Sequence, residues 1–441
     1  MSQKTAIDVR SFTGFLLFLG MKVLYDFSVW VFSGMLRMAS GGDSKLARLV
    51  RGRKPVFDEI AIFREKHHGK VAWFHVASLG EYEQAKPVIA RLKQEFPAMA
   101  VLVTFFSPSG YENVIKKPQP NVDGVTYLPF DTEGNAKHFL NLVKPSVVFF
   151  VKYDLWANFI FEAKKRQVPL FLFSAALRKD QVYFQFYGGF FRKVLKCFDH
   201  IYVQNDQTQR LLGEIGVSET TVTGDTRYDN VRAISQSPKQ FPEIEALFGQ
   251  KKVMVIGSAW PEDMEVILPF VNSHEDFHYI IAPHDINDAQ IADWQLQIKH
   301  PSIKYSELDG ASSEGVKVLF IDNIGMLSSL YQYAKVAYVG GAFGKGLHNI
   351  LEPLAFYIPV LFGKLKKASK FPEGGISQQY GCGFEVEDAA AFEKIILALE
   401  APEAYDQAVN AAEKLVMDNL GSAANIINSV KNTVQWSKKE G

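Results

Sequence analysis

A glycine-rich stretch near residue 340 combines residue types suited to binding a nucleotide. Gly-Gly-Ala-Phe-Gly-Lys-Gly occupies residues 340–346 and follows the apolar run Val336–Val339, which is typical of a buried strand. The apolar-periodic stretch after it predicts a helix, so free backbone N–H groups and the helix dipole would favour an anion at this loop. Asn349 and Glu352 lie three residues apart at the start of that helix and could contact hydroxyl groups of the same ligand. The stretch therefore predicts a nucleotide or nucleotide-sugar site.

A glutamate in the first half of the chain could act as a general base. Glu81 follows the apolar run Val71–Ala77 and a flexible glycine, Gly80, at the start of a predicted helix. A carboxylate at a strand end is well placed to take a proton from a substrate. The alternative is structural, because Ser78 and Glu81 have the spacing of a capping box and an acid in a first helical turn complements the dipole. The sequence leaves both interpretations open.

Other strand ends in the first half also carry polar residues. Residues 107–110, Ser-Pro-Ser-Gly, could present N–H groups to an anion, or could form a plain turn. Lys152 and Asp154 straddle a strand end and could stabilise charge, or could be a surface pair. Arg227 lies near a predicted linker and could neutralise a carboxylate or phosphate, or could make an interdomain salt bridge.

Two strand ends in the second half of the chain also carry residues that could contact a ligand. Pro283 and His284 end one apolar run, and the histidine is either a site residue or a structural loop residue. Residues 324–326, Ile-Gly-Met, begin a helix after another run, and Gly325 would allow a base or ribose to approach the backbone closely.

Strand-like and helix-like stretches alternate along both halves, which predicts parallel sheets covered by helices on both faces. The polar segment Arg232 to Pro242 is typical of a linker. We therefore expect an N-terminal helix over residues 1–40, one α/β domain over 41–232 and a second over 243–441, with the active site in the cleft between two facing sheets. The expected strands are Val71–Ala77, Ala100–Phe105, Val125–Leu128, Val147–Val151, Leu170–Ser174, His200–Val203, Thr221–Thr223, Val253–Gly257, Tyr279–Ala282, Val316–Ile321, Val336–Val339 and Val360–Phe362.

Composition sets the broad class. A chain of 441 residues is too long for one core and suggests two domains. Lysine plus arginine and aspartate plus glutamate are balanced at 48 each, so bulk charge gives no argument for a nucleic-acid partner. Cys197 and Cys382 lie far apart and have no metal-type spacing, which fits a reducing compartment and argues against a disulfide scaffold.

The N-terminal region predicts contact with a membrane. Residues 12–38 are rich in Phe, Leu, Val, Trp and Met, interrupted by Lys22 and Asp26, and a cleaved signal peptide is not expected. An apolar helix followed by positive charge indicates an anchor whose basic flank stays cytoplasmic, either spanning the membrane or lying on it. The alternative is an amphipathic helix docked on the protein itself. The basic residues are Lys45, Arg48, Arg51, Arg53 and Lys54.

Taken together and in order, these motifs resemble those of bacterial 3-deoxy-D-manno-octulosonic acid (Kdo) transferases, which move Kdo from CMP-Kdo to the lipid A precursor. Each motif is weak alone, but the ordered set, from roughly residue 50 to 385, is specific. The residues that carry the resemblance are His75 to Glu81, Thr104 with Ser107 to Gly110, Tyr127 to Asp131, Leu155 and Trp156 with Asn158, Val222 to Gly224 with Arg227 and Asp229, and the glycine stretch through Glu352 and Pro353.

The resemblance implies a GT-B fold, in which two Rossmann-like domains face each other across a cleft, here with an added N-terminal apolar helix. The first domain would bind the acceptor and the second the CMP-sugar. It implies inverting, metal-independent chemistry with no cofactor beyond the donor CMP-Kdo. The expected partners are CMP-Kdo, the lipid A precursor and the cytoplasmic face of the cell inner membrane, with no nucleic acid.

The resemblance also implies roles for single residues. Glu81 falls on the family's catalytic base, and Arg227 falls on a basic residue thought to stabilise the transition state, usually a lysine. The family's CMP contacts fall on Pro283, His284, Ile324, Gly325, Met326, Asn349, Ile350, Leu351 and Glu352. Further substrate contacts are expected at Ser78, Gly80, Ser107, Gly110, Gly341 and His348.

The chain departs from the family pattern at chemically important positions. Lys152 stands where the family has a glutamate expected to act in the transition state, so Lys152 or Asp154 would serve there in another way. His284 and Asp285 stand where the family has an Arg-His pair, and the usual Ser-Thr-His-Glu run is here Ser-Ala-Trp-Pro-Glu, residues 258–262. Two alternatives stay open: another nucleotide-sugar GT-B enzyme, such as a UDP-sugar transferase or epimerase, and an inactive membrane scaffold that retains nucleotide binding.

Overall fold

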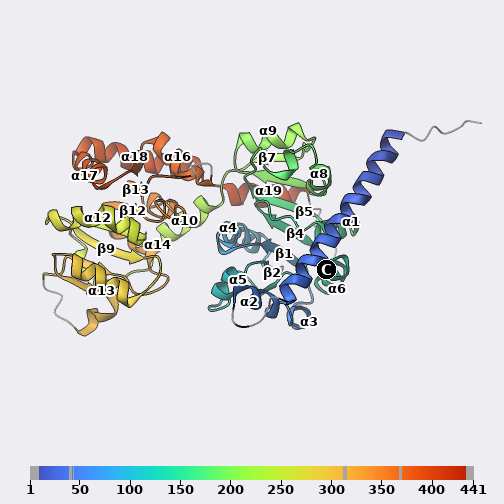
Figure 1. Ribbon diagram of the computed structural model, residues 1–441, viewed down its shortest axis with the longest axis horizontal. Coiled ribbons are helices and arrows are strands. Elements are labelled where there is room, and N and C mark those ends of the chain that lie inside the picture. Colours follow the sequence, from blue (N-terminus) through green and yellow to red (C-terminus); the bar gives the residue numbers. More distant parts are fainter. Residues whose placement is uncertain (1–8, 39–41, 43, 311–314, 367–369, 434–441) are drawn as a thin grey trace, which may run out of the picture. The chain divides into compact units, whose positions relative to one another are not determined.

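The computed structural model describes residues 9–38, 42, 44–310, 315–366 and 370–433, and the chain divides into two compact units (Figure 1). The first unit comprises residues 1–226 and 421–441, and the second comprises residues 227–420. Each unit has a seven-stranded parallel sheet among its described residues, which confirms two Rossmann-like domains.

In the first unit the strands lie in the order β3-β2-β1-β4-β5-β6-β7. They are β1 (Val71–Val76), β2 (Ala100–Phe105), β3 (Gly124–Tyr127), β4 (Val147–Val151), β5 (Leu170–Ala175), β6 (His200–Val203) and β7 (Thr220–Val222). The helices are α1 (Val9–Met38), α2 (Lys45–Arg51), α3 (Val56–Lys66), α4 (Leu79–Glu95), α5 (Pro108–Val114), α6 (Glu133–Val143), α7 (Ala157–Lys165), η1 (Val182–Phe184), α8 (Gly189–Leu195), α9 (Asp206–Glu214) and α19 (Ser422–Thr433).

In the second unit the order is β10-β11-β9-β8-β12-β13-β14. The strands are β8 (Val253–Ala259), β9 (His278–Pro283), β10 (Ser302–Lys304), β11 (Val318–Phe320), β12 (Val336–Val339), β13 (Val360–Gly363) and β14 (Gly383–Val386). The helices are α10 (Arg227–Gln236), α11 (Pro242–Phe248), α12 (Pro261–Ser273), α13 (Asp288–Gln297), η2 (Tyr305–Gly310), α14 (Leu327–Leu330), η3 (Tyr331–Tyr333), α15 (Leu351–Leu354), α16 (Pro372–Tyr380), α17 (Ala389–Ala398) and α18 (Pro402–Asp418).

Continuous apolar strands explain why both faces of each sheet are covered. Along β1, Trp73 packs into one core while Phe74 packs into the core on the opposite face. In β8, Val255 and Ile256 are divided between two cores in the same way. Alternate side chains of a strand point to opposite faces, so a strand that is apolar throughout must be buried on both. Every strand expected from the sequence is present, whereas the short strands β10 and β14 were not expected.

The division into units differs from the expected boundaries at both ends of the second unit. Helix α10 already belongs to the second unit, so the expected linker is helical as far as Gln236. Helix α19 returns to the first unit, where Ile426 and Ile427 are fully buried against the first sheet. Its Lys431 also pairs with Glu95 of α4 at 2.6 Å. The apolar stripe of this last helix has its matching surface on the first sheet, not the second.

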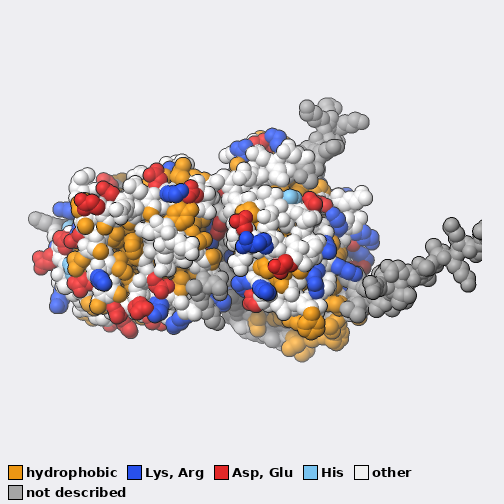
Figure 2. Space-filling model, turned by 90° about the horizontal axis from the view of Figure 1, so that it is seen from above, with side chains coloured by type: hydrophobic (Ala, Val, Ile, Leu, Met, Phe, Trp, Pro, Cys, Tyr) orange, Lys and Arg blue, Asp and Glu red, His pale blue; other side chains and the backbone are white. Residues whose placement is uncertain are grey.

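Helix α1 has an unusual distribution of side chains. Its polar Lys22, Tyr25 and Asp26 are partly buried and make hydrogen bonds, whereas its apolar Phe27 and Trp30 are 59% and 67% exposed. Figure 2 shows hydrophobic side chains gathered along this edge of the first unit. Within the described part of the chain, no helix has the length and apolarity needed to cross a membrane.

Candidate active site

Glu81 lies in the first turn of α4, where the chain has just left β1. Its residue is only 6% exposed. The carboxylate Oε2 accepts a hydrogen bond from the Ala77 N–H at 2.5 Å, and the Ser78 hydroxyl accepts one from the Glu81 N–H at 3.4 Å. Two backbone donors at the helix start are thereby satisfied. Ser78 therefore caps the helix as considered from the sequence, whereas Glu81 bonds to the N–H of Ala77 and not to that of Ser78, so the capping box is incomplete.

The burial that accompanies this cap also tunes the carboxyl group. Burial raises the pKa of Glu81 to about 7; the Ala77 N–H and Lys152 lower it, and Asp154 raises it. A carboxyl group with this pKa is about half ionised at neutral pH, where a general base works best. Capping and base catalysis are thus compatible uses of one geometry at this position.

Lys152 and Asp154 lie on the loop that leaves β4. Strands β1 and β4 are neighbours, and the order of the strands reverses between them. Loops at such a reversal are a general place for ligands in parallel sheets. Lys152 has a φ of +62°, and its N–H donates to the Phe173 carbonyl at 2.9 Å. The structure therefore brings Lys152 and Asp154 into the electrostatic surroundings of Glu81.

A buried histidine links this loop to the sheet. The Trp156 indole N–H donates to His75 Nε2 at 2.9 Å and also lies 3.0 Å from Asp154 Oδ2. His75 Nδ1 lies 3.0 Å from the hydroxyl oxygen of Thr104, and burial lowers the pKa of His75. Because Nε2 accepts the indole proton, we assign a neutral ring with its proton on Nδ1. The 3.4 Å contact between His75 and Asp154 is then not an ion pair.

From the sequence, His75 was named only as part of the family resemblance, and its hydrogen bonds were not predicted. The signal was a single ionisable residue inside the apolar run Val71–Val76. Such a residue must have polar partners once it is buried, and here the partners lead to Asp154 through Trp156.

The loop after β2 approaches the same helix start. Ser107 precedes α5, and its hydroxyl lies 2.9 Å from that of Ser109. A Cβ atom at Gly110 would come within 3.1 Å of the Leu79 nitrogen, so this glycine permits close contact between α5 and the start of α4. Gly80 is exposed. Ser107, Gly110 and Gly80 therefore surround the turn that carries Glu81.

Arg227 begins α10 and is anchored by an acid. Its Nη1 donates to Glu373 Oε1 at 3.2 Å, and Glu373, in the first turn of α16, is 7% exposed. Both residues belong to the second unit, so this pair is not the interdomain salt bridge considered from the sequence. A charge-assisted bond to a buried carboxylate restricts where the guanidinium can lie.

The glycine stretch after β12 is organised around a second acid, Asp263 of α12. This fully buried carboxylate accepts hydrogen bonds from the N–H groups of Gly341 and Trp260, each at 2.9 Å, and from the Tyr338 hydroxyl at 2.8 Å. A Cβ atom at Gly340 would lie 2.4 Å from Asp263 Oδ2, which explains the glycine. The Gly341 N–H is therefore not one of the free donors expected in this loop, because it already has an acceptor within the protein.

The expected helix after the glycine stretch is also much shorter than predicted. Helix α15 has four residues, and Pro353 lies within it. So short a helix has little dipole, and Pro353 in its first turn has no N–H group to offer an anion. The N–H of His348 instead donates to the Gly340 carbonyl at 3.2 Å, so the chain is held mainly as a folded loop.

The residues at the start of α15 fall into two groups, one in the core and one that is partly exposed. Ile350 and Leu351 are 0% and 1% exposed and belong to the core, so their side chains do not face a ligand. The Asn349 amide donates to Glu352 Oε1 at 3.2 Å, and its oxygen accepts the Leu351 N–H at 3.2 Å. Asn349 and Glu352 thus lie together, as expected for a pair that contacts one ligand.

Three aromatic rings cluster beside the glycine stretch. The His284 ring lies 4.3 Å from Trp260 and 4.3 Å from His348, measured between ring centroids. The Trp260 indole donates to His348 Nε2 at 3.1 Å, and burial with the nearby His284 lowers the pKa of His348 to about 4. The Lys345 ammonium group lies 4.1 Å from the Trp260 ring centroid. A cation and flat rings therefore occupy the region where the family pattern has an arginine.

The remaining candidates at the strand ends differ in exposure. Ile324 is 84% exposed, Gly325 has a φ of +86°, and Met326 is 6% exposed. Pro283 is the last residue of β9, directly before His284. Positive φ favours glycine, so the backbone at residue 325 is open to a ligand without side-chain hindrance.

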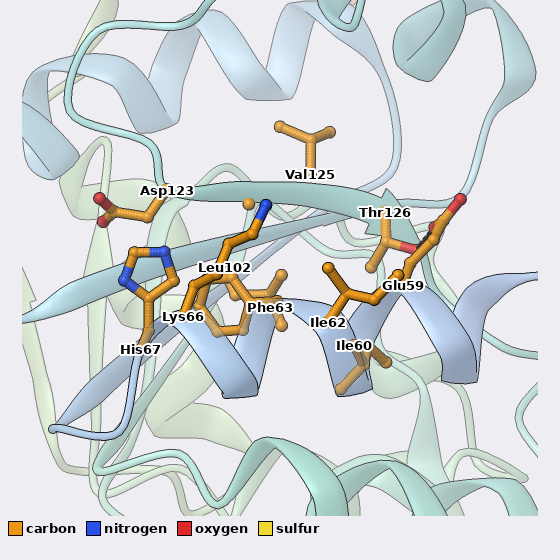
Figure 3. Close-up of a pocket in the computed structure, with 11 residues that line it drawn as sticks. Glu59, Ile60, Ile62, Phe63, Lys66, His67, Leu102, Asp123, Val125 and Thr126 are labelled. Atoms are coloured by element: carbon orange, nitrogen blue, oxygen red, sulfur yellow. Dashed lines mark hydrogen bonds between the residues drawn. The ribbon is translucent and has the colours of Figure 1, made fainter.

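A cavity of about 170 Å³ lies elsewhere in the first unit, between α3 and the edge strand β3 (Figure 3). It is lined by residues such as Phe63, Leu102 and Val125, and none of the candidate residues contributes to it. Among the described residues, no cluster of histidine, cysteine and acidic side chains could hold a metal ion.

Comparison with known proteins shows what the chain is related to. A family model described as 3-deoxy-D-manno-octulosonic-acid transferase (kdotransferase) matches residues 53–230. The 3-deoxy-D-manno-octulosonic acid transferase of Chlamydophila psittaci is 29% identical over 322 residues, covering 71% of this chain and 74% of its own. This chain is thus related to the Kdo transferases. The Haemophilus influenzae member is 26% identical over 375 residues, covering 81% of this chain and 86% of its own.

The match to the Kdo transferase family model includes Glu81, Lys152, Asp154 and Arg227. A crystal structure of UDP-N-acetylglucosamine 2-epimerase superimposes with a TM-score of 0.57 at 15% identity, covering 84% of this chain and 98% of that one. At this identity the likeness concerns the fold alone. It agrees with the pair of Rossmann-like domains that GT-B proteins contain, and it does not favour the UDP-sugar alternative.

Proposed function

We propose that this protein is an inverting glycosyltransferase that moves Kdo from CMP-Kdo onto a lipid A precursor, a step of lipopolysaccharide biosynthesis. The observation that carries the proposal is the state of Glu81: a buried carboxyl group with a pKa of about 7, within the segment that matches the Kdo transferase family. The sequence relatives named as Kdo transferases supply the substrate class.

Glu81 would act as the general base. It takes the proton of an acceptor hydroxyl group while that oxygen attacks the anomeric carbon of Kdo. The new carbon–oxygen bond forms as the bond from that carbon to the CMP phosphate oxygen breaks, and CMP leaves with the electron pair. Attack from the face opposite CMP inverts the configuration. A positioned base contributes a rate factor of about 10²–10⁴.

The residues around Glu81 have different tasks in this proposal. Lys152 lowers the pKa of Glu81 and Asp154 raises it, so the two set how much of the base is ionised at working pH. Ser78 fixes the helix start, and the loop with Ser107 and Gly110 borders the space that the acceptor sugar would use.

The second unit would hold the CMP part of the donor. Arg227, restrained by Glu373, balances the charge of the leaving phosphate. Asn349 and Glu352 bind the ribose hydroxyl groups, and the backbone at residues 324–326 borders the base. Pro283, His284 and His348 line the nucleotide region, where Lys345 adds a positive charge near the rings. The N–H of Gly341 is already bonded to Asp263, so this residue would help the donor to bind only by leaving room beside the loop. No cofactor or metal is required, so activity should persist in excess chelator.

We further propose that α1 holds the protein on the cytoplasmic face of the inner membrane. The support is its exposed apolar side, with Phe27, Trp30 and Met35 at 59%, 67% and 61%. Exposed aromatic and aliphatic side chains on one helix are typical of binding in the membrane interface. Of the basic flank, Arg53 is 8% exposed and donates to three carbonyl groups, so it cannot serve the lipid; Arg51 and Lys54 are exposed.

The assay for the function is CMP release from CMP-Kdo in the presence of a lipid A precursor, with the product mass measured. Product heavier by Kdo supports the proposal, and turnover of UDP-sugars without turnover of CMP-Kdo contradicts it. Membrane binding is tested by Phe27→Gln with Trp30→Gln, which should reduce co-sedimentation with anionic vesicles. Ser28→Ala, at an exposed hydroxyl that bonds within the helix, is the matched control. Unchanged sedimentation of the double variant contradicts the membrane proposal.

A further inference from the structure

The polar side of α1 contacts the part of the first unit that carries Trp156 and Asp154. Helix α1 runs along this unit beside α8 (Figure 1). The Tyr25 hydroxyl donates to Asp131 Oδ2 at 2.5 Å, and its ring centroid lies 5.2 Å from that of Phe190. Asp26 accepts a hydrogen bond from the Asn158 amide at 2.9 Å. A helix that only lay on a membrane could leave Tyr25 and Asp26 in water, but here both side chains form hydrogen bonds with the rest of the first unit.

These contacts meet at the first turn of α7. Asp131, 1% exposed, accepts the N–H groups of Asn158 and Phe159, both at 3.1 Å. The Tyr25 oxygen lies 3.4 Å from the Ala157 nitrogen. The first N–H groups of a helix have no partner within it, and a buried end needs outside acceptors. Asp131, held by Tyr25, provides them.

The residue before this turn is Trp156, the N-cap of α7. Its indole N–H bonds to His75 and lies close to Asp154, and its ring stacks on Phe106 with centroids 4.5 Å apart. The Arg53 guanidinium lies 4.7 Å from the Phe106 ring centroid. A shift of the α7 start would therefore move the Trp156 indole and, with it, the carboxylate of Asp154.

We propose that α1 is a structural part of the acceptor site and that Tyr25 is a positioning residue for the transfer reaction, acting through Asp131, the α7 start and Trp156. The inference rests on the proposed function for the reaction that Tyr25 would affect. The structural link from Tyr25 to the start of α7 does not depend on that function. It gives α1 two separate faces, an apolar one for lipid and a polar one for the site. Deleting residues 1–40 would remove both, so deletion cannot distinguish anchoring from positioning.

The test is Tyr25→Phe in the full-length chain, assayed in detergent micelles so that membrane binding plays no part. The ring packing is kept and one hydroxyl group is lost. We expect kcat to fall roughly tenfold or more, since small displacements near reacting groups have large effects, with KM for CMP-Kdo unchanged. Amide hydrogen exchange at residues 157–159 should accelerate. Asp131→Asn should lower kcat similarly, and the double variant should lose little more than either single one. Ser28→Ala, on the same helix, should change neither kcat nor exchange.

The outcomes separate the inference from the proposed function. An active wild type with equally active Tyr25→Phe overturns the inference and leaves the function intact. Unchanged exchange at residues 157–159 overturns it whatever the activity. An inactive wild type contradicts the function, and the exchange measurement still decides the structural step. If Tyr25→Phe fails to fold, Asp26→Ala is judged by the same two readouts, because it removes a different contact of the same face.

Discussion

The two units differ in how they hold their candidate ionisable residues, although burial also lowers the pKa of one of them in the second unit, His348. In the first unit, Glu81 and His75 are buried, bonded to neighbours and shifted in pKa. In the second, His284 and Ile324 are exposed, and the buried acid Asp263 serves the loop and not a ligand directly. The contrast fits a division of labour, since a reacting group needs a fixed and tuned environment, whereas a nucleotide must enter and leave. Four predictions test this comparison, beginning with the largest expected effect.

Glu81→Gln should lower kcat by about 10²–10⁴, the usual contribution of a general base. The amide oxygen can still accept the Ala77 N–H, so the cap is retained. We assign CMP binding to the second unit, so the affinity of the variant for CMP, measured by calorimetry, should equal that of the wild type. Full activity of the variant would mean that the first unit does not supply the base.

The contribution of Glu81 to the stability of the wild type should fall as pH rises from about 4.5 to about 7. The pKa of Glu81 is about 7 in the folded state against a reference of 4.5, so the folded protein binds this proton more tightly than the unfolded chain. The contribution is fully present below about pH 4.5 and is lost as pH passes about 7, amounting to about 3 kcal/mol. Denaturant unfolding at several pH values should show this slope in wild type and its reduction in Glu81→Gln. If the free energy of unfolding depended on pH equally in both proteins, the raised pKa of Glu81 would be contradicted.

Asp263→Ala should weaken donor use while sparing the base. Three donors, from Gly341, Trp260 and Tyr338, would lose their acceptor. We expect KM for CMP-Kdo to rise by roughly tenfold and the melting temperature to drop, since a buried donor without a partner costs about 1–3 kcal/mol. Glu262→Ala, at the exposed neighbouring acid, is the matched control. A fall in kcat with no change in KM would assign Asp263 to catalysis. It would contradict the view that the second unit only binds the donor.

The smallest effects should come from the charges beside Glu81. Lys152 lowers the pKa of Glu81 and Asp154 raises it. Lys152→Met should therefore move the rising limb of the kcat–pH profile to higher pH, and Asp154→Asn should move it to lower pH. Shifts in the same direction would contradict these electrostatic roles.

The regular elements could be predicted because each depends on local pattern. Continuous apolar runs such as Val147–Val151 specified strands in both sheets, and Ser78 with Glu81 specified a helix start. The glycine stretch was located correctly, but its hydrogen bonds were not. The partner of Gly341 is Asp263, 78 residues earlier, and sequence spacing contains no information on such a contact.

Other features were missed for the same reason. The neutral state of His75 depends on Trp156, 81 residues away, and the inward polar face of α1 depends on Asp131, 106 residues from Tyr25. The affiliation of α19 with the first sheet likewise follows from long-range packing. Local preference determines elements, whereas the tuning of a site comes from residues that only folding brings together.

We propose Glu81 as the general base with which this chain would transfer Kdo. The most direct measurement is single-turnover release of CMP from CMP-Kdo with a lipid A precursor, compared between wild type and Glu81→Gln, with product mass recorded. The account predicts a Kdo-bearing lipid product from the wild type and a loss of about 10²–10⁴ in rate for the variant, with CMP affinity retained. Equal rates, or CMP release without a heavier lipid, would contradict it.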